Sequence, residues 1–68
     1  MLEKLKSIRT KWGFTYKEMA TFLGISKTFY WQIENKKRTL TYKMAVKIAS
    51  VFNEKPDSLF YEEFKNKE

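Results

Sequence analysis

The chain contains no cysteine and no histidine among its 68 residues. The missing thiols exclude a disulfide framework, and the two absences together remove the side chains most used for nucleophilic attack, proton transfer and metal binding. Glycine occurs twice and proline once, so no flexible or proline-rich linker divides the chain. We therefore expect a single domain over residues 1–68, with no catalytic site, no metal site and no cofactor.

Long apolar runs are absent as well. No stretch approaches the roughly 18 consecutive apolar residues that suggest a membrane-spanning helix. The charged segment MLEKLKSIR at the start lacks the apolar region of a signal peptide. A chain without cysteine also fits a reducing compartment. We expect a soluble, cytoplasmic protein that does not bind membranes.

Acidic side chains are scarce in most of the chain. Residues 1–53 hold 11 basic and 3 acidic side chains, whereas residues 54–68 hold 3 basic and 5 acidic ones, and the formal net charge is +6. Six basic residues follow one another with only Glu34 between them, namely Lys27, Lys36, Lys37, Arg38, Lys43 and Lys47. Such a surface suits a polyanion, although a solvated lysine face has the same composition.

Aromatic side chains are abundant, at 18% of the residues. They bury large areas, so a chain of this length can form a core without a metal or a disulfide. Apolar residues recur at helical spacing and no strand pattern competes, which predicts an all-α fold class. The expected helices cover about residues 2–12, 16–23, 27–34, 42–52 and 56–63. A short C-terminal tail, residues 61–68, follows the helical body of about residues 2–60.

Residues 15–34, TYKEMATFLGISKTFYWQIE, contain the most specific pattern of the chain. Thr15 and Glu18 are spaced as a capping box at the start of one helix, and Ser26 is an N-cap for the next. Gly24 can take the left-handed conformation that ends the first of these helices. Two short helices joined in this way are typical of a DNA-reading helix-turn-helix, although similar hairpins occur in proteins that never bind DNA.

Five short helices with this motif at positions two and three resemble the Cro and repressor type DNA-binding family, also called the xenobiotic response element family. The resemblance covers residues 2–60 and depends on the segments LKSIR, EMATFLGIS, IEN and KIASVF. It implies a compact repressor-like domain with a structural ion pair between Arg9 and Glu34. Because an unpaired buried charge is costly, Glu34 is expected to be a framework residue rather than a reader of bases.

The resemblance also implies which residues contact DNA. Base reading in the major groove would involve residues 27–34, and the residues expected on the outer face of this helix are Lys27, Thr28, Trp31 and Gln32. Lysine can donate to guanine, glutamine can pair with adenine, and threonine offers a hydroxyl and a methyl, although Lys27 could equally contact a phosphate. The residues expected at the DNA backbone are Tyr16, Lys37, Arg38, Thr39 and Lys43. Tyr16 could instead simply cover the end of its helix.

Three residues depart from the family pattern. Lys36 stands where glycine is usual, so Asn35 or Lys36 must adopt an unfavourable conformation, at a cost of about 1 kcal/mol, or the turn must differ. Tyr30 replaces a β-branched core residue and needs a partner for its hydroxyl. Trp31 replaces a small polar residue, and it could pack on a thymine methyl or a sugar, or form with Phe29 an apolar patch that binds a protein.

Two functions are compatible with these patterns. The first is a sequence-specific transcriptional regulator, a small dimeric repressor of bacterial, phage or mobile-element origin that binds an inverted-repeat operator in double-stranded DNA. Phe60, Tyr61 and Phe64 are candidates for its homodimer interface, and packing on the core is the alternative for them. The second is a protein-binding regulator, antirepressor or antitoxin-like, with an exposed aromatic face around Phe29 and Trp31.

Overall fold

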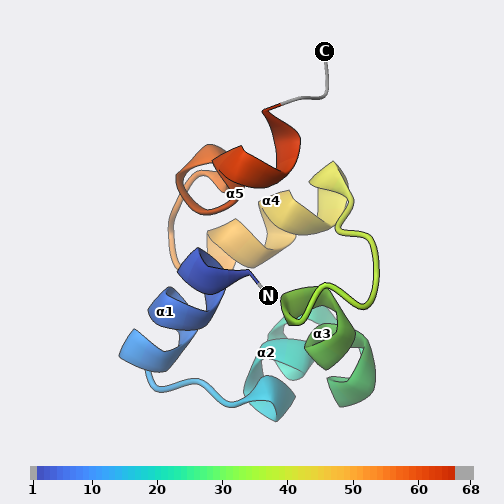
Figure 1. The fold of residues 1–68 in the computed structure, drawn as a ribbon. Coiled ribbons are helices and arrows are strands. Elements are labelled where there is room, and N and C mark those ends of the chain that lie inside the picture. Colours follow the sequence, from blue (N-terminus) through green and yellow to red (C-terminus); the bar gives the residue numbers. More distant parts are fainter. Residues whose placement is uncertain (1, 66–68) are drawn as a thin grey trace.

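The computed structural model describes residues 2–65, and this range forms five α-helices and no strand. The helices are α1 (Glu3–Lys11), α2 (Tyr16–Leu23), α3 (Lys27–Glu34), α4 (Tyr42–Val51) and α5 (Pro56–Phe64). In Figure 1, α2 and α3 pack together in the lower part of the molecule, α4 and α5 pack together above them, and α1 lies on the left. Contacts of α2 with α4 join the two pairs, and contacts with α5 hold α1 in place. The all-α, five-helix prediction is confirmed.

Capping residues set the helix starts. The hydroxyl of Thr15 accepts from the backbone N–H of Glu18 at 3.1 Å, and the Glu18 carboxylate accepts from the N–H of Thr15 at 2.9 Å, which forms the predicted capping box. Ser26 and Thr41 cap α3 and α4 through bonds of 3.0 and 3.1 Å. Gly24 ends α2 with a φ of +70°, so the turn of the helix-turn-helix has the left-handed residue that it needs.

The core receives side chains from all five helices. The largest fully buried apolar residues are Leu5, Met19, Tyr30, Ile33, Ile48, Phe52 and Phe60. They form one continuous cluster to which α3 contributes Tyr30 and Ile33, so packing in this core fixes the orientation of α3. The polar face of α3 is thereby held outward.

The last helix ends at Phe64, close to the end expected at about residue 63. It therefore includes the first residues of the segment 61–68, which is also expected as a tail, and residues 66–68 lie outside the described range. The backbone of Phe60 departs from helical geometry, with φ −125° and ψ 19°, and its side chain is 1% exposed. The ring of Phe64 meets the ring of Tyr42 edge-on, with 5.5 Å between centroids. At the kink, the side chain of Phe60 enters the core, and beyond the kink Phe64 contacts Tyr42 of α4.

Lys36 adopts the left-handed conformation after α3, with a φ of +59°. This is one of the outcomes expected where glycine is usual. The neighbouring Asn35 keeps a φ of −96°. Lys36, and not Asn35, therefore has the strained left-handed backbone conformation in this turn.

We expect Lys36→Gly to be more stable than Lys36→Ala by about 1 kcal/mol, because glycine takes a positive φ without a Cβ clash. Alanine is the matched control, since both changes remove the exposed contact of Lys36 Nζ with Glu63 Oε1 at 3.5 Å. Urea unfolding of the two variants measures the difference. Equal stability would show that the conformation at Lys36 costs nothing.

Candidate nucleic-acid interface

A buried ion pair joins α1 to the end of α3. Arg9 Nε and Nη2 donate to the two carboxylate oxygens of Glu34, at 2.8 and 3.0 Å. The Glu34 side chain is fully buried and Arg9 is 8% exposed. Arg9 Nη1 also donates to the backbone carbonyl of Phe14 at 2.7 Å. The structure thus brings together the two residues assigned to the framework pair, and this contact anchors the last turn of α3.

Tyr30 belongs to the same network. Its hydroxyl donates to Glu34 Oε1 at 2.7 Å, which provides the partner that a buried tyrosine in this position needs. Burial raises the pKa of Tyr30, and the hydrogen bond to Glu34 raises it further because the phenolate would face a carboxylate. The hydrogen bond to Glu34 also raises the pKa of Arg9. Both donors to Glu34 therefore keep their protons, and within residues 2–65 no buried side-chain nitrogen or oxygen lacks a partner.

Tyr16, the first residue of α2, packs on this network. The Arg9 guanidinium lies over the Tyr16 ring, 4.5 Å from Cζ to the centroid, and the Tyr30 ring is 6.0 Å away. The ring of Tyr16 is partly buried against the core. A cation over an aromatic face holds the ring in place, so Tyr16 is a fixed feature beside α3 rather than a loose cover of the helix end.

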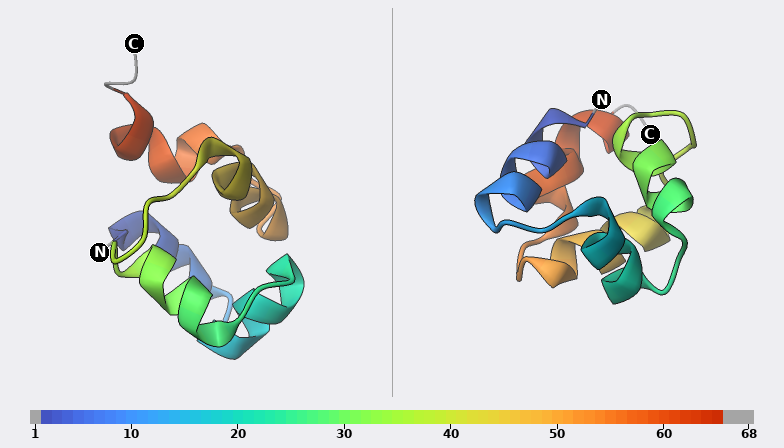
Figure 2. Two further views of the ribbon diagram at one scale, coloured as in Figure 1. Left: turned by 90° about the vertical axis from the view of Figure 1, so that its right-hand side faces the viewer. Right: turned by 90° about the horizontal axis from the view of Figure 1, so that it is seen from below.

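The outer face of α3 carries three of the four residues assigned to base reading. Lys27, Thr28 and Trp31 are exposed, and Trp31 retains 40% of its accessible surface. The left view of Figure 2 shows α3 across the front of the molecule, with the segment 35–41 rising from its end to the start of α4. This arrangement presents the polar face of α3 and the basic segment 35–41 on one side.

Gln32, the fourth of these residues, is paired with Arg38. Arg38 Nε donates to Gln32 Oε1 at 3.2 Å, and the guanidinium lies over the Phe29 ring at 4.3 Å. The sequence predicts Arg38 as a contact to the DNA backbone, whereas the structure places it against a residue assigned to base reading. No local pattern could reveal this contact, because it depends on the path of the segment 35–41. Arg38 is therefore able to orient the amide of Gln32.

Phe29 and Trp31 do not share a face. Two residues apart, they point in directions that differ by about 200° around the helix. Phe29 is partly buried against the core and lies under Arg38, whereas Trp31 is exposed. The two rings therefore lie on different sides of α3, so an aromatic surface around them presents mainly Trp31.

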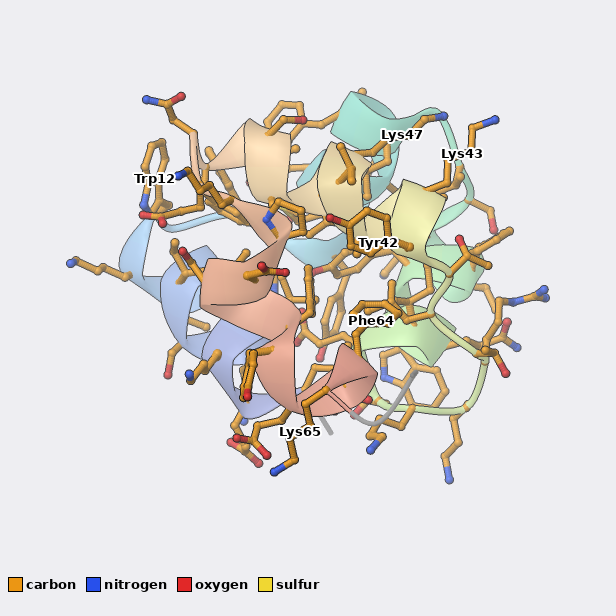
Figure 3. All side chains as sticks on the ribbon, turned by 90° about the horizontal axis from the view of Figure 1, so that it is seen from above. Trp12, Tyr42, Lys43, Lys47, Phe64 and Lys65 are labelled. Atoms are coloured by element: carbon orange, nitrogen blue, oxygen red, sulfur yellow. The ribbon has the colours of Figure 1, made fainter. Side chains whose placement is uncertain are left out.

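Further basic residues flank α3. Lys37 and Thr39 are exposed in the segment 35–41, and the backbone N–H of Lys37 donates to the Gln32 carbonyl at 2.7 Å, so this segment begins against α3. Figure 3 shows Lys43 and Lys47 pointing the same way from α4, away from Phe64. Lys43 and Lys47 are four residues apart, so they are neighbours on one face of α4. This spacing could have identified Lys47 from the sequence as a further candidate for contact with the DNA backbone.

The three tail aromatics have different environments. Phe60 is a core residue, which is the alternative stated for it, and it offers no surface to a second copy. Phe64 is partly buried against the core and contacts Tyr42. Tyr61 is 57% exposed. Of the residues assigned to a dimer interface, Tyr61 presents the largest exposed surface.

The helices α2 and α3 are joined by a turn at Gly24, and a buried ion pair holds α3 so that its polar side chains are exposed. These features define a protein of the helix-turn-helix class. The chain belongs to the helix-turn-helix domain family, which matches residues 2–63. The resemblance to helix-turn-helix proteins of the Cro and repressor type is thereby confirmed, and the class indicates a DNA-binding regulator. No curated protein and no solved structure matches the chain significantly.

Two further observations concern residues 2–65, the part of the chain that the structure describes. None of its helices combines the length and the apolar character needed to cross a bilayer. Among the same residues, no group of three or more histidine, cysteine, aspartate or glutamate side chains could hold a metal ion.

Proposed function

We propose that this chain is a sequence-specific transcriptional regulator that represses by occupying its operator. The observation that carries the proposal is the position of α3, whose inner face is locked by Glu34 while its outer face carries hydrogen-bonding side chains flanked by exposed cations. An α-helix fits the major groove, and flanking cations can bind the phosphates on either side. The proposed role is binding without catalysis, and a regulator acting on operator DNA would work in the cytoplasm.

The proposed contacts divide into two groups. The residues proposed to read bases are Lys27, Thr28, Trp31 and Gln32, and those proposed to bind the DNA backbone are Tyr16, Lys37, Arg38, Thr39, Lys43 and Lys47. Arg38 has a second proposed role, because its hydrogen bond to Gln32 orients a base-reading amide. One short helix reads only a few base pairs, so we propose a homodimer on an inverted repeat, with half-site centres about 34 Å apart or a multiple of it.

Selection of bound sequences from a random duplex pool tests the proposed function. We expect enrichment of an inverted repeat, and an affinity that falls steeply as salt is raised because each phosphate contact releases counterions. Binding that is equal for the enriched and random duplexes would contradict sequence-specific regulation. A chain that binds no duplex at low salt would exclude the DNA-binding role altogether.

We expect deletion of residues 61–68 to weaken operator binding while the helical fold is largely kept, because Phe60 remains in the core and the exposed Tyr61 is lost. Tyr61→Ser should also weaken operator binding, and it should disturb α5 less than the deletion does. The matched control is Phe22→Ser, which removes an aromatic ring that is 51% exposed on α2. Sedimentation with and without a two-half-site duplex measures assembly. A protein that stays monomeric on that duplex would contradict the dimer.

A further inference from the structure

A hollow of about 240 Å³ opens between the first turn of α2 and the outer face of α3. It is lined by Tyr16, Lys27, Thr28 and Trp31. Two aromatic rings, a threonine methyl and the aliphatic stem of a lysine are the apolar groups that these residues supply. The hollow thus interrupts a polar surface with an apolar recess beside the helix proposed to enter the major groove.

The chemistry of the major groove limits what can occupy such a recess. Base edges there present hydrogen-bond donors and acceptors, and the one apolar group among them is the C5-methyl of thymine. A donor or acceptor in the recess would need to reach the polar end of Lys27 or Thr28, whereas a methyl group packs on the two aromatic rings without needing a hydrogen-bond partner. One water molecule takes about 30 Å³ in the liquid, so the hollow has room for a methyl group and the ring edge that carries it.

One wall of the hollow is fixed before any ligand arrives. Tyr16 packs under the guanidinium of Arg9, which is itself held by Glu34. A wall that is already ordered loses little conformational freedom when a group packs against it. Trp31 supplies a second aromatic surface to the hollow, from α3.

We propose that this hollow binds the C5-methyl group of an operator thymine and that Trp31 determines this specificity, an inference that rests on the proposed DNA-binding function. Tyr16 acts as the fixed wall and Thr28 contributes its methyl to the lining. The thymine contact accounts for a large apolar ring on a helix face that is otherwise polar. It also distinguishes Trp31 from Gln32 and Lys27, whose hydrogen bonds would read other base edges.

The test compares the selected operator with duplexes in which single thymines are replaced by deoxyuridine, which lacks only the methyl group. For the unmodified protein, we expect one position in each half-site at which the replacement lowers affinity about fourfold, the factor that corresponds to burial of one methyl-sized group. The loss should disappear in Trp31→Ser and persist in the control Phe22→Ser. Thr28→Ser, which keeps the hydroxyl and removes a methyl, should reduce it.

Two results would overturn the thymine site and leave the proposed function intact. The first is selective binding of an operator in which no deoxyuridine replacement changes the affinity, or of an operator whose half-sites contain no thymine. The other is a methyl effect of equal size in the unmodified protein, Trp31→Ser and Thr28→Ser, because the methyl would then contact a different part of the surface. Failure of the unmodified protein to bind any duplex would instead overturn both the proposed function and the thymine site.

Discussion

Glu34→Ala should lower the free energy of unfolding by about 3 to 5 kcal/mol, because it leaves the Arg9 guanidinium largely buried without its carboxylate. The same change removes the acceptor of the Tyr30 hydroxyl. Small domains are stable by only about 5 to 15 kcal/mol, so the variant should unfold at a much lower denaturant concentration. Urea unfolding followed by circular dichroism measures the loss.

A double-mutant cycle between Arg9→Ala and Glu34→Ala separates the pair from other effects of each change. Strong coupling is expected, since the second truncation removes a group that the first has already left without a partner. Additive losses would contradict a direct interaction. Tyr30→Phe is a milder companion variant that keeps the ring and removes one hydrogen bond, with an expected loss of about 1 kcal/mol. A Glu34 variant of unchanged stability and reduced DNA affinity would place Glu34 in the interface instead.

Gln32→Ala should weaken binding to the selected operator by about 1 to 3 kcal/mol and leave binding to random duplexes nearly unchanged, because contacts to base edges carry sequence information. Thr28→Ala should act in the same direction. Titration of each variant against the operator and a scrambled duplex at one salt concentration measures the discrimination. Equal losses on both duplexes would remove these residues from the base-reading group.

Lys37→Ala is the matched comparison for a backbone contact. Affinity should fall on every duplex, and the slope of log affinity against log salt should become shallower by about one unit. Arg38→Ala should combine both effects, because the exposed Arg38 is proposed to contact a DNA phosphate and also donates to Gln32. If Arg38→Ala behaves exactly as Lys37→Ala does, the contact with Gln32 has no role in reading bases.

Features that depend on a few neighbouring residues were predictable from the sequence. Thr15, Ser26 and Thr41 cap the helices at which they stand, because a cap bonds to an amide only a few residues away. Gly24 takes the left-handed conformation expected of it at the end of its helix. The helix-turn-helix and the five-helix order follow from such local signals and from apolar spacing, and the family match is consistent with both.

The tertiary structure alone decided how several residues are used. The sequence left both core packing and a dimer interface open for Phe60 and Tyr61, and the structure places Phe60 in the core at a kink while Tyr61 stays exposed. The sequence also cannot show that Arg38 crosses Phe29 to reach Gln32, since that contact depends on the path of the segment 35–41.

The hollow beside Trp31 has the same origin. It requires the start of α2 to lie beside the outer face of α3, where Tyr16 packs on Arg9 and Tyr30. The sequence by itself determined the helices, their ends and the class of protein, because these depend on contacts between near neighbours in the chain. The composition of the surface proposed to face DNA depends on contacts between residues far apart in the chain, and only the folded molecule brings those residues together.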